Sequence, residues 1–439
     1  MGAPERPNVL VVLTDQQRWD TVGAYGSPMA LTPCLDRLAA EGTLLEYCFS
    51  NQPLCAPARG CLQTGQYATT HGVWRNNIAL VPKGPTLADA FRGAGYEVGY
   101  IGKWHLANTR TAPCPPETRG GYVDHWEAAD ILEFTSKPYG GYVYDKEDRR
   151  VELEGYRVDA LTDLAVRFLS ARRERPFFLF LSYVEPHHQN DMERFVAPDG
   201  YRERYANPWV PGDLLGRPGD WYASLPDYYG MIARIDECLA RLVAALEAAG
   251  KQEETIILFT SDHGCHFRTR NREYKRSCHE ASVRVPAVLW GPGVRPGHTV
   301  RNLVGLVDLP PTLLDACGIE IPSSMQGRSM MPLIRGSSRD WLDEVFVQIS
   351  EAEVGRALRT RRWKYGVFAP DQKGSAVPAA ERYVERYLYD LYADPHEQVN
   401  LVGRHDMVAV AEHLRARLAW HIERVEGAAP LIEAAAYPA

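Results

Sequence analysis

VLVVLTDQQ, residues 9–17, is a run of five apolar residues and a threonine that ends directly in Asp15, Gln16 and Gln17. A short, continuous apolar run is typical of a strand buried on both faces, as in a parallel sheet. Three other segments have the same form: EVGYIGKWH at 97–105, FFLFLSYVEPHHQ at 177–189 and TIILFTSDHG at 255–264. The four segments therefore predict parallel strands of one sheet.

Helical segments alternate with these strands. Apolar residues recur at three and four positions in 31–42, 86–95, 157–172 and, most clearly, 229–250. Alternating strands and helices predict an α/β fold with a mostly parallel sheet. Ligands of such sheets bind outside the carboxyl ends of the strands, so we expect the polar residues that follow the four strands to meet at one edge.

The pattern changes after about residue 340. Residues 345–350, 357–368 and 385–394 resemble antiparallel strands, and a helix follows at about 405–425. We therefore predict a catalytic α/β domain over 1–340 and a smaller α+β subdomain, built on an antiparallel sheet, over 341–439. Residues 190–225 are predicted to form a long surface loop at the pocket mouth, and 427–439 a surface arm.

Composition narrows the class of protein. The 439 residues include 49 Lys and Arg against 56 Asp and Glu, a net charge of −7, and no basic run that suggests a nucleic-acid partner. No apolar run is long enough for a membrane span, and the N-terminus lacks the pattern of a signal peptide. We expect a cytoplasmic protein, or a secreted or periplasmic one if a leader was removed, able to form a homo-oligomer. Nine scattered cysteines without a CxxC pair indicate neither disulfides nor zinc.

One cysteine has a distinctive setting, CAPARGCLQTG at 55–65. Pro57 suits the first turn of a helix, which places Cys55 at the positive N-terminal end of that helix. Such a position favours an anion. Cys55 read alone could instead be a buried structural residue, or a thiolate nucleophile that needs a nearby base.

The motif resembles that of the formylglycine-dependent (type I) sulfatases of the alkaline phosphatase superfamily. The resemblance rests on Cys55, Pro57, Arg59, Thr64 and Gly65, with Ala58 where a serine is usual. It implies a large mixed, mostly parallel sheet sandwiched by helices. It also implies that a formylglycine-generating enzyme oxidises Cys55 to Cα-formylglycine, whose hydrate is the nucleophile.

The resemblance also implies a divalent metal site. Its ligands would be Asp15, Gln16, Cys55 in modified form, Asp262 and His263; Gln16 stands where a second aspartate is common. A set dominated by oxygen suits Ca²⁺ best, with Mg²⁺ or Mn²⁺ as alternatives.

The remaining catalytic residues are likewise implied by the resemblance. Lys103 of GKWH would contact the sulfate and the nucleophile, and His105 would take a proton from the nucleophile. His187 would protonate the leaving oxygen, whereas Arg59 and Lys275, the first residue of KRSCHEASVRVP at 275–286, would add positive charge around the sulfate.

Polar and aromatic residues near these motifs suit a carbohydrate substrate, although each could equally be an ordinary loop residue. They are Trp74, Arg75, Asn76, His188, Gln189, Asn190, His266, Arg268, Arg270 and Asn271.

The sequence thus predicts a hydrolase of sulfate monoesters, acting on a sulfated carbohydrate. One alternative keeps the nucleophile but changes the substrate to a phosphonate monoester or phosphodiester, because the Asp15–Gln16 pair resembles that branch of the superfamily. A second alternative is a sulfatase-like binding protein without activity, which is disfavoured because no core position is missing.

Overall fold

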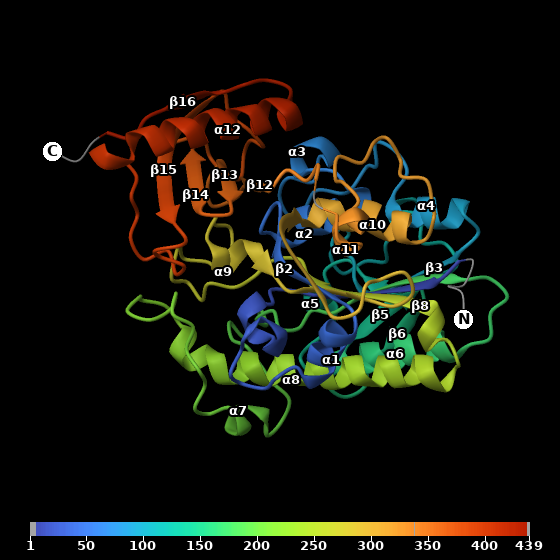
Figure 1. Cartoon of the computed structure of the whole chain (residues 1–439). Coiled ribbons are helices and arrows are strands. Elements are labelled where there is room, and N and C mark those ends of the chain that lie inside the picture. Colours follow the sequence, from blue (N-terminus) through green and yellow to red (C-terminus); the bar gives the residue numbers. More distant parts are fainter. Residues whose placement is uncertain (1–5, 338, 437–439) are drawn as a thin grey trace.

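The computed structural model describes residues 6–337 and 339–436 (Figure 1). The outermost ends of the two predicted domains, 1–5 and 437–439, lie outside this range. Within it, no helix is both long enough and apolar enough to cross a lipid bilayer.

The described residues form two separate sheets, of eleven and five strands. The large sheet has the order β11-β2-β10-β8-β1-β7-β3-β4-β5-β6, with β9 paired to β2. Its strands are β1 (Asn8–Thr14), β2 (Thr43–Phe49), β3 (Glu97–Lys103), β4 (His125–Ala129), β5 (Tyr142–Asp145), β6 (Arg150–Glu152), β7 (Phe177–Ser182), β8 (Thr255–Ser261), β9 (Arg284–Val285), β10 (Ala287–Trp290) and β11 (His298–Gly305).

The four strands predicted from the sequence form the centre of this sheet. In the order β8-β1-β7-β3 they all run parallel, and Val9 of β1 lies opposite Ile256 on one side and Phe178 on the other. The sheet is mixed because β10 pairs antiparallel with β8 and β2, and β5 pairs antiparallel with β4 and β6. The predicted fold class is confirmed.

Helices cover both faces of the large sheet, as Figure 1 shows. Alternate residues of β1 point to opposite faces: Val9 and Val11 belong to one core, and Leu10 and Val12 to the other. The first core includes residues of α2 (Cys55–Thr64), α4 (Leu87–Gly93), α10 (Leu309–Ala316) and α11 (Met331–Ile334). The second includes residues of α1 (Pro33–Glu41), α6 (Arg157–Ser170) and α8 (Trp221–Ala248).

Helix α8 begins earlier than the sequence predicts, at Trp221 rather than at Tyr229. Pro226 argues against a helix because it cannot donate the backbone hydrogen bond, yet it lies in the second turn of α8. Leu225 and Tyr228 on either side are fully buried and hold this turn against the protein. The predicted loop 190–225 is therefore shorter and contains α7 (Tyr201–Arg204).

The smaller sheet has the order β12-β13-β14-β15-β16. Its strands are β12 (Glu344–Ile349), β13 (Gly355–Thr360), β14 (Trp363–Phe368), β15 (Arg382–Asp390) and β16 (Leu431–Glu433), and α12 (Val408–Glu426) packs on it. Residues 357–368, which looked like one strand, form two antiparallel strands joined at Arg361 and Arg362. Part of the predicted surface arm is β16, which pairs parallel to β15.

The remaining helices are short. They are α3 (Ala68–His71), α5 (Leu132–Thr135) and α9 (Glu280–Val283), together with the 3₁₀ turns η1 (Trp19–Thr21), η2 (Gly23–Tyr25), η3 (Pro116–Thr118), η4 (Gln252–Glu254), η5 (Leu306–Asp308) and η6 (His405–Met407).

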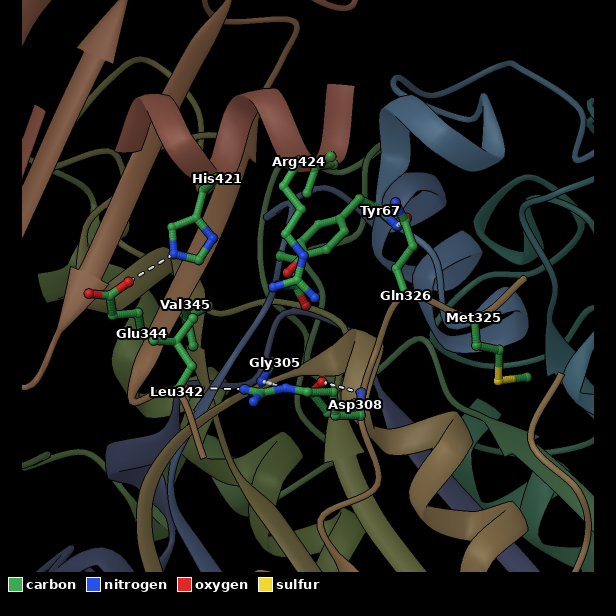
Figure 2. Close-up of a pocket in the computed structure, with 13 residues that line it drawn as sticks. Tyr67, Gly305, Asp308, Met325, Gln326, Leu342, Glu344, Val345, His421 and Arg424 are labelled. Carbon is green, nitrogen blue, oxygen red and sulfur yellow. Dashed lines mark hydrogen bonds and ion pairs between the residues drawn. The ribbon is translucent and has the colours of Figure 1, made fainter. Parts of the chain in front are cut away.

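Buried ion pairs join the two sheets. Glu280 of α9 lies 2.6 Å from Lys364 and 2.9 Å from Arg359, both on the small sheet, and Glu397 lies 3.0 Å from Lys364. A polar cavity of about 230 Å³ lies at the same junction (Figure 2). Glu344, His421 and Arg424 line it from the small subdomain, and Tyr67 and Asp308 from the large domain.

Candidate active site

The carboxyl ends of the central strands bring the predicted polar residues together. Asp15 follows β1, Lys103 ends β3 and Asp262 follows β8. Parallel register fixes this arrangement, since Leu13 pairs with Thr260 and Thr14 with Ser261. The backbone of Gln16, in the left-handed region at φ 71°, turns so that its N–H donates to Asp262 Oδ1 at 3.2 Å.

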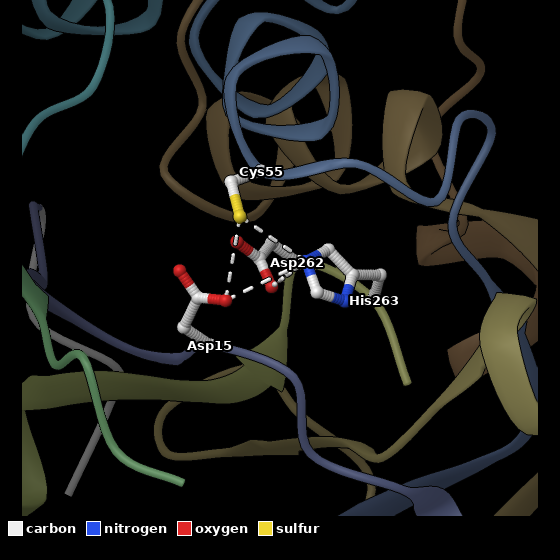
Figure 3. A group of neighbouring side chains, drawn as sticks. All are labelled: Asp15, Cys55, Asp262 and His263. Atoms are coloured by element: carbon white, nitrogen blue, oxygen red, sulfur yellow. Dashed lines mark hydrogen bonds and ion pairs between the residues drawn. The ribbon is translucent and has the colours of Figure 1, made fainter. Parts of the chain in front are cut away.

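Cys55 is the first residue of helix α2 and its side chain faces these strand ends (Figure 3). Its Sγ lies 3.6 Å from Asp15 Oδ1 and 3.3 Å from His263 Nε2, and it accepts a hydrogen bond of 2.9 Å from Lys275 Nζ. Pro57 lies in the first turn of α2, as the sequence predicts. The residue at position 55 is therefore placed at the centre of the site.

Four buried side chains could hold a metal ion. One ligand atom each from Asp15, Cys55, Asp262 and His263 lies within 4.8 Å of all the others. His263 Nδ1 lies 2.9 Å from the carbonyl oxygen of Gly264, which can only accept, so Nδ1 carries the proton. The Nε2 lone pair consequently faces the cluster, the tautomer that a metal ligand requires.

One buried acceptor beside this cluster, Gln16 Oε1, has no hydrogen-bond donor among the described residues. Asp262 Oδ2 lies 3.2 Å from Arg59 Nε, its ion-pair partner, without an aligned hydrogen bond. Burying such an acceptor without a partner costs about 1–3 kcal/mol, a cost that a bound cation would offset. The residues present therefore fit a divalent cation that prefers oxygen ligands.

Lys103 and Arg59 lie behind the cluster. Lys103 Nζ donates to Asp15 Oδ2 at 2.7 Å and to Glu133 Oε1 at 2.6 Å. Arg59 donates to Asp15 Oδ2 at 3.1 Å and to Ser182 Oγ at 2.7 Å. Arg59 is 1% exposed and supports the carboxylates, and it is not part of the pocket wall. Its predicted contact with sulfate stays a prediction.

These neighbours set the protonation of the site. Burial alone would raise the pKa of the Cys55 thiol, but Lys103 and Lys275 together hold it well below its usual range. Burial would likewise raise the pKa of Asp15, whereas Lys103 lowers it strongly. Burial and the nearby charge of Asp15 raise the pKa of Asp262 to about 6. The site thus stabilises negative charge at positions 15 and 55.

A pocket of about 220 Å³ opens above Cys55. Of the predicted catalytic residues, Cys55, His105, His187 and Lys275 line it. Its other lining residues are Asn76, Asn77, Ile131, Glu133, Phe134, His188, Asn190, Glu273 and Arg276.

The two predicted catalytic histidines of the pocket wall differ in their hydrogen bonds. His187 Nδ1 donates to the carbonyl oxygen of His188 at 2.6 Å, which leaves Nε2 facing Lys275 Nζ at 3.0 Å. Burial, with Lys275, lowers the pKa of His187. His105 keeps its Nδ1 buried and without a partner within the described chain, and its backbone is left-handed at φ 60°.

The predicted substrate-binding residues are spread over several places. Of these ten, Asn76, His188 and Asn190 line the pocket, and the His188 ring stacks on that of His187. Gln189 accepts from Arg157 at 3.1 Å, away from the pocket.

The other predicted substrate-binding residues also have partners elsewhere. His266 Nε2 donates to the carbonyl of Lys275 at 3.1 Å, and Arg270 donates to backbone carbonyls of the small subdomain. Arg75 lies over the Trp74 ring, and Arg268 lines a neighbouring surface groove. The roles of these residues stay predictions.

Sequence reasoning missed several lining residues, above all Glu133. Glu133 comes shortly after β4, so an acid just beyond a strand end was the available signal. The apolar part of β4 is too short to stand out in the sequence.

Comparison with known proteins agrees with this geometry. Residues 7–319 match the family model described as Sulfatase, and 272–424 match N-sulphoglucosamine sulphohydrolase, C-terminal. The chain is 30% identical to an ulvan-active sulfatase of Formosa agariphila, covering 94% of this chain and 81% of that protein. It is 25% identical to an N-acetylglucosamine-6-O-sulfatase of Bacteroides thetaiotaomicron, covering 91% and 83%.

Two solved structures bear on the alternatives. A putative sulfatase from Bacteroides fragilis superposes with a TM-score of 0.84 at 26% identity, covering 97% of each chain. A phosphonate monoester hydrolase of Agrobacterium radiobacter has a TM-score of 0.71 at 26% identity, covering 94% of this chain and 95% of that protein.

The family model covers most of the chain, including Cys55 and both metal-ligand segments. The chain therefore belongs to the sulfatase family.

Proposed function

We propose that this sulfuric ester hydrolase acts on sulfated carbohydrates, with Cys55 converted to Cα-formylglycine by a maturation enzyme. The observation that carries the proposal is the position of Cys55, at the start of α2, beneath the pocket and within reach of Asp15, His263 and Lys275. The hydrate of the aldehyde supplies one hydroxyl for attack on sulfur and a second whose loss of a proton releases sulfate.

Asp15, Gln16, Asp262 and His263 would hold a divalent cation beside residue 55. When bound, the cation polarises a sulfuryl oxygen and favours the ionised form of a nearby hydroxyl. Oxygen ligands predominate in this set, which favours Ca²⁺, with Mg²⁺ and Mn²⁺ as alternatives.

The chain's own residues manage charge and protons. Lys275, whose ammonium donates to Cys55, neutralises the negative charge of the sulfuryl oxygens. Lys103, which donates to Asp15, adds a second positive charge to the site. His187 Nε2 protonates the departing oxygen. A sulfate held by Lys275 offsets the lysine charge that lowers the pKa of His187, which favours the protonated imidazole. His105, whose Nδ1 has no partner in the described chain, accepts the proton on the nucleophile's side.

A sugar substrate is supported by two observations. Polar groups of the pocket wall, including Asn76, His188 and Asn190, can bind hydroxyl groups. One relative is named for N-acetylglucosamine 6-sulfate and another for ulvan. The test is release of inorganic sulfate from a panel of sulfated mono- and oligosaccharides, using protein of verified formylglycine content. Turnover of at least one sugar is expected, and hydrolysis of aryl sulfates alone would contradict the sugar assignment.

Hydrolysis of phosphonate monoesters is the second candidate, favoured by the amide Gln16 beside Asp15 and by the likeness to a phosphonate monoester hydrolase. The same cationic residues would accept a phosphonate. Parallel kinetics with p-nitrophenyl sulfate and p-nitrophenyl phenylphosphonate separate the two. A clearly higher kcat/KM for the phosphonate would overturn the sulfatase proposal.

A further inference from the structure

Glu133 is a buried carboxylate in the wall of the pocket that contains Cys55. It belongs to the short helix α5, and its side chain is 2% exposed. Oε1 accepts the hydrogen bond from Lys103, whereas Oε2 is buried and has no donor in the described part of the chain. Glu133 nevertheless lines the same pocket as Cys55 and Lys275. Glu133 therefore brings a buried acceptor without a protein donor to the wall of this pocket.

Lys103 does not depend on Glu133 alone for an acidic partner. Lys103 already has an acidic partner, Asp15, at 2.7 Å. A further negative charge beside the catalytic lysine repels a sulfate ester. A buried acceptor without a partner is costly in the free protein, and a donor from a bound substrate would satisfy it.

The position of Glu133 also places it on the path of a substrate. A second cavity of about 690 Å³ shares Glu133 and Phe134 with the catalytic pocket. Phe134 and Tyr139 are 43% and 44% exposed in it, and the Arg110 guanidinium lies 5.1 Å from the Phe134 ring. Aromatic faces with a nearby cation suit an anionic sugar. A sugar whose sulfate binds at residue 55 and whose ring occupies this second cavity lies beside the Glu133 carboxylate.

We propose that Glu133 is a specificity-determining residue, whose free Oε2 accepts a hydrogen bond from a substrate hydroxyl on the carbon next to the sulfate ester. This inference rests on the proposed function. It implies that a second sulfate or a carboxylate at that carbon is rejected, because it would face a carboxylate and could not donate.

The experiment compares two aryl sulfates of similar size, 2-hydroxyphenyl sulfate and 2-methoxyphenyl sulfate, on protein of verified formylglycine content. Only the first can donate a hydrogen bond next to the ester. The measured quantity is the ratio of their kcat/KM values. Lys103 and the nucleophile act on both esters, so a change in either cancels in the ratio. A role of Glu133 limited to tuning Lys103 would therefore leave the ratio unchanged.

The wild-type ratio is expected to favour the hydroxyl compound by about tenfold. Glu133→Leu should bring it close to one, and Glu133→Gln should lower it less, since the amide oxygen still accepts. Glu127→Gln neutralises a carboxylate of β4 that pairs with Arg167 outside the pocket, and should keep the wild-type ratio.

The outcomes separate the inference from the function on which it rests. A ratio near one in the wild type, or an unchanged ratio in both Glu133 variants, overturns the role of Glu133 while sulfatase activity stands. Hydrolysis by the wild type of neither ester and of no sulfated sugar in the panel overturns both. If Glu133→Leu does not fold, the drop in Glu133→Gln alone decides.

Discussion

Two regions of this protein bury clusters of charged residues, and they differ in how completely those residues are paired. At the junction of the sheets, Glu280 accepts from Lys364 with Oε1 and from Arg359 with both oxygens. At the strand ends around Cys55, Gln16 Oε1, His105 Nδ1 and Glu133 Oε2 lack hydrogen-bond partners among the described residues. The ion pairs at the junction hold the small subdomain against the large domain. The groups without partners around Cys55 can instead bind a cation or a substrate.

Each cluster holds one carboxylate whose pKa is lowered and one whose pKa is raised. Burial would raise the pKa of Glu280, but Arg359 and Lys364 lower it strongly, whereas burial and the charge of Glu280 raise the pKa of Glu397. Around Cys55, burial would raise the pKa of Asp15, but Lys103 lowers it, whereas burial and the charge of Asp15 raise the pKa of Asp262 to about 6. The two regions therefore differ in the groups that lack a hydrogen-bond partner, and not in the direction of these pKa shifts.

The largest effect is expected from the nucleophile. Cys55→Ser supplies one hydroxyl but lacks the second hydroxyl of the hydrate, so the unoxidised variant should take up at most one sulfate per protein and then stop, a loss of at least about a thousandfold in turnover. Intact-protein mass spectrometry after incubation with p-nitrophenyl sulfate detects the covalent sulfate. Sustained multiple turnovers would contradict the proposed release step.

Removing one cation from the site should have the next largest effect. Lys275→Ala takes the ammonium away from residue 55 and from His187, and kcat/KM for p-nitrophenyl sulfate should fall about a hundredfold or more. Lys146→Ala, an exposed lysine far from the pocket, is the matched control. Equal activity of the two variants would remove Lys275 from the mechanism.

The junction cluster should matter for stability. Glu280→Gln leaves the buried Lys364 and Arg359 short of a carboxylate and should lower the free energy of unfolding by about 3–5 kcal/mol. Urea unfolding followed by tryptophan fluorescence measures it. Asp406→Asn, which breaks the exposed pair with Arg404, should leave stability unchanged. A similar midpoint for both variants would contradict the structural role of the cluster.

The smallest effect concerns pH. Glu344 lies 3.0 Å from His421 (Figure 2). Burial would raise the pKa of Glu344, but His421 and Arg417 lower it to about 2 from 4.5. A lowered carboxyl pKa stabilises the fold above pH 4.5, and that stabilisation is lost as pH falls toward 2. Glu344→Gln should therefore cost about 1–2 kcal/mol at neutral pH and less at each step from pH 4.5 downward. A pH-independent difference would exclude this linkage.

The sequence predicted the fold and the centre of the site for the same physical reason. Four buried strands in parallel register carry Asp15, Lys103 and Asp262 to one edge, so strand position alone places them. The position of a loop side chain, by contrast, depends on partners that are far away in the sequence. Gln189 is held by Arg157, and Arg270 by the backbone at Glu397. Neither contact has a local sequence signal, so loop composition suggested a substrate role that the contacts do not support.

Glu133 was missed because β4, the strand that precedes it, is short and because its partner Lys103 is thirty residues away in the sequence. The division of 357–368 into two strands was missed because no Gly, Pro, Asn or Asp marks the turn at Arg361 and Arg362. In both cases, tertiary contacts decide what local sequence leaves open.

The most direct test of the central claim joins two measurements on one sample. Protein produced with graded amounts of a formylglycine-generating enzyme is digested, and mass spectrometry gives the fraction of residue 55 that is aldehyde. Sulfatase activity is measured on the same preparations. The account predicts that activity rises in proportion to the aldehyde fraction and extrapolates to zero for unmodified Cys55. Activity independent of that fraction would contradict it.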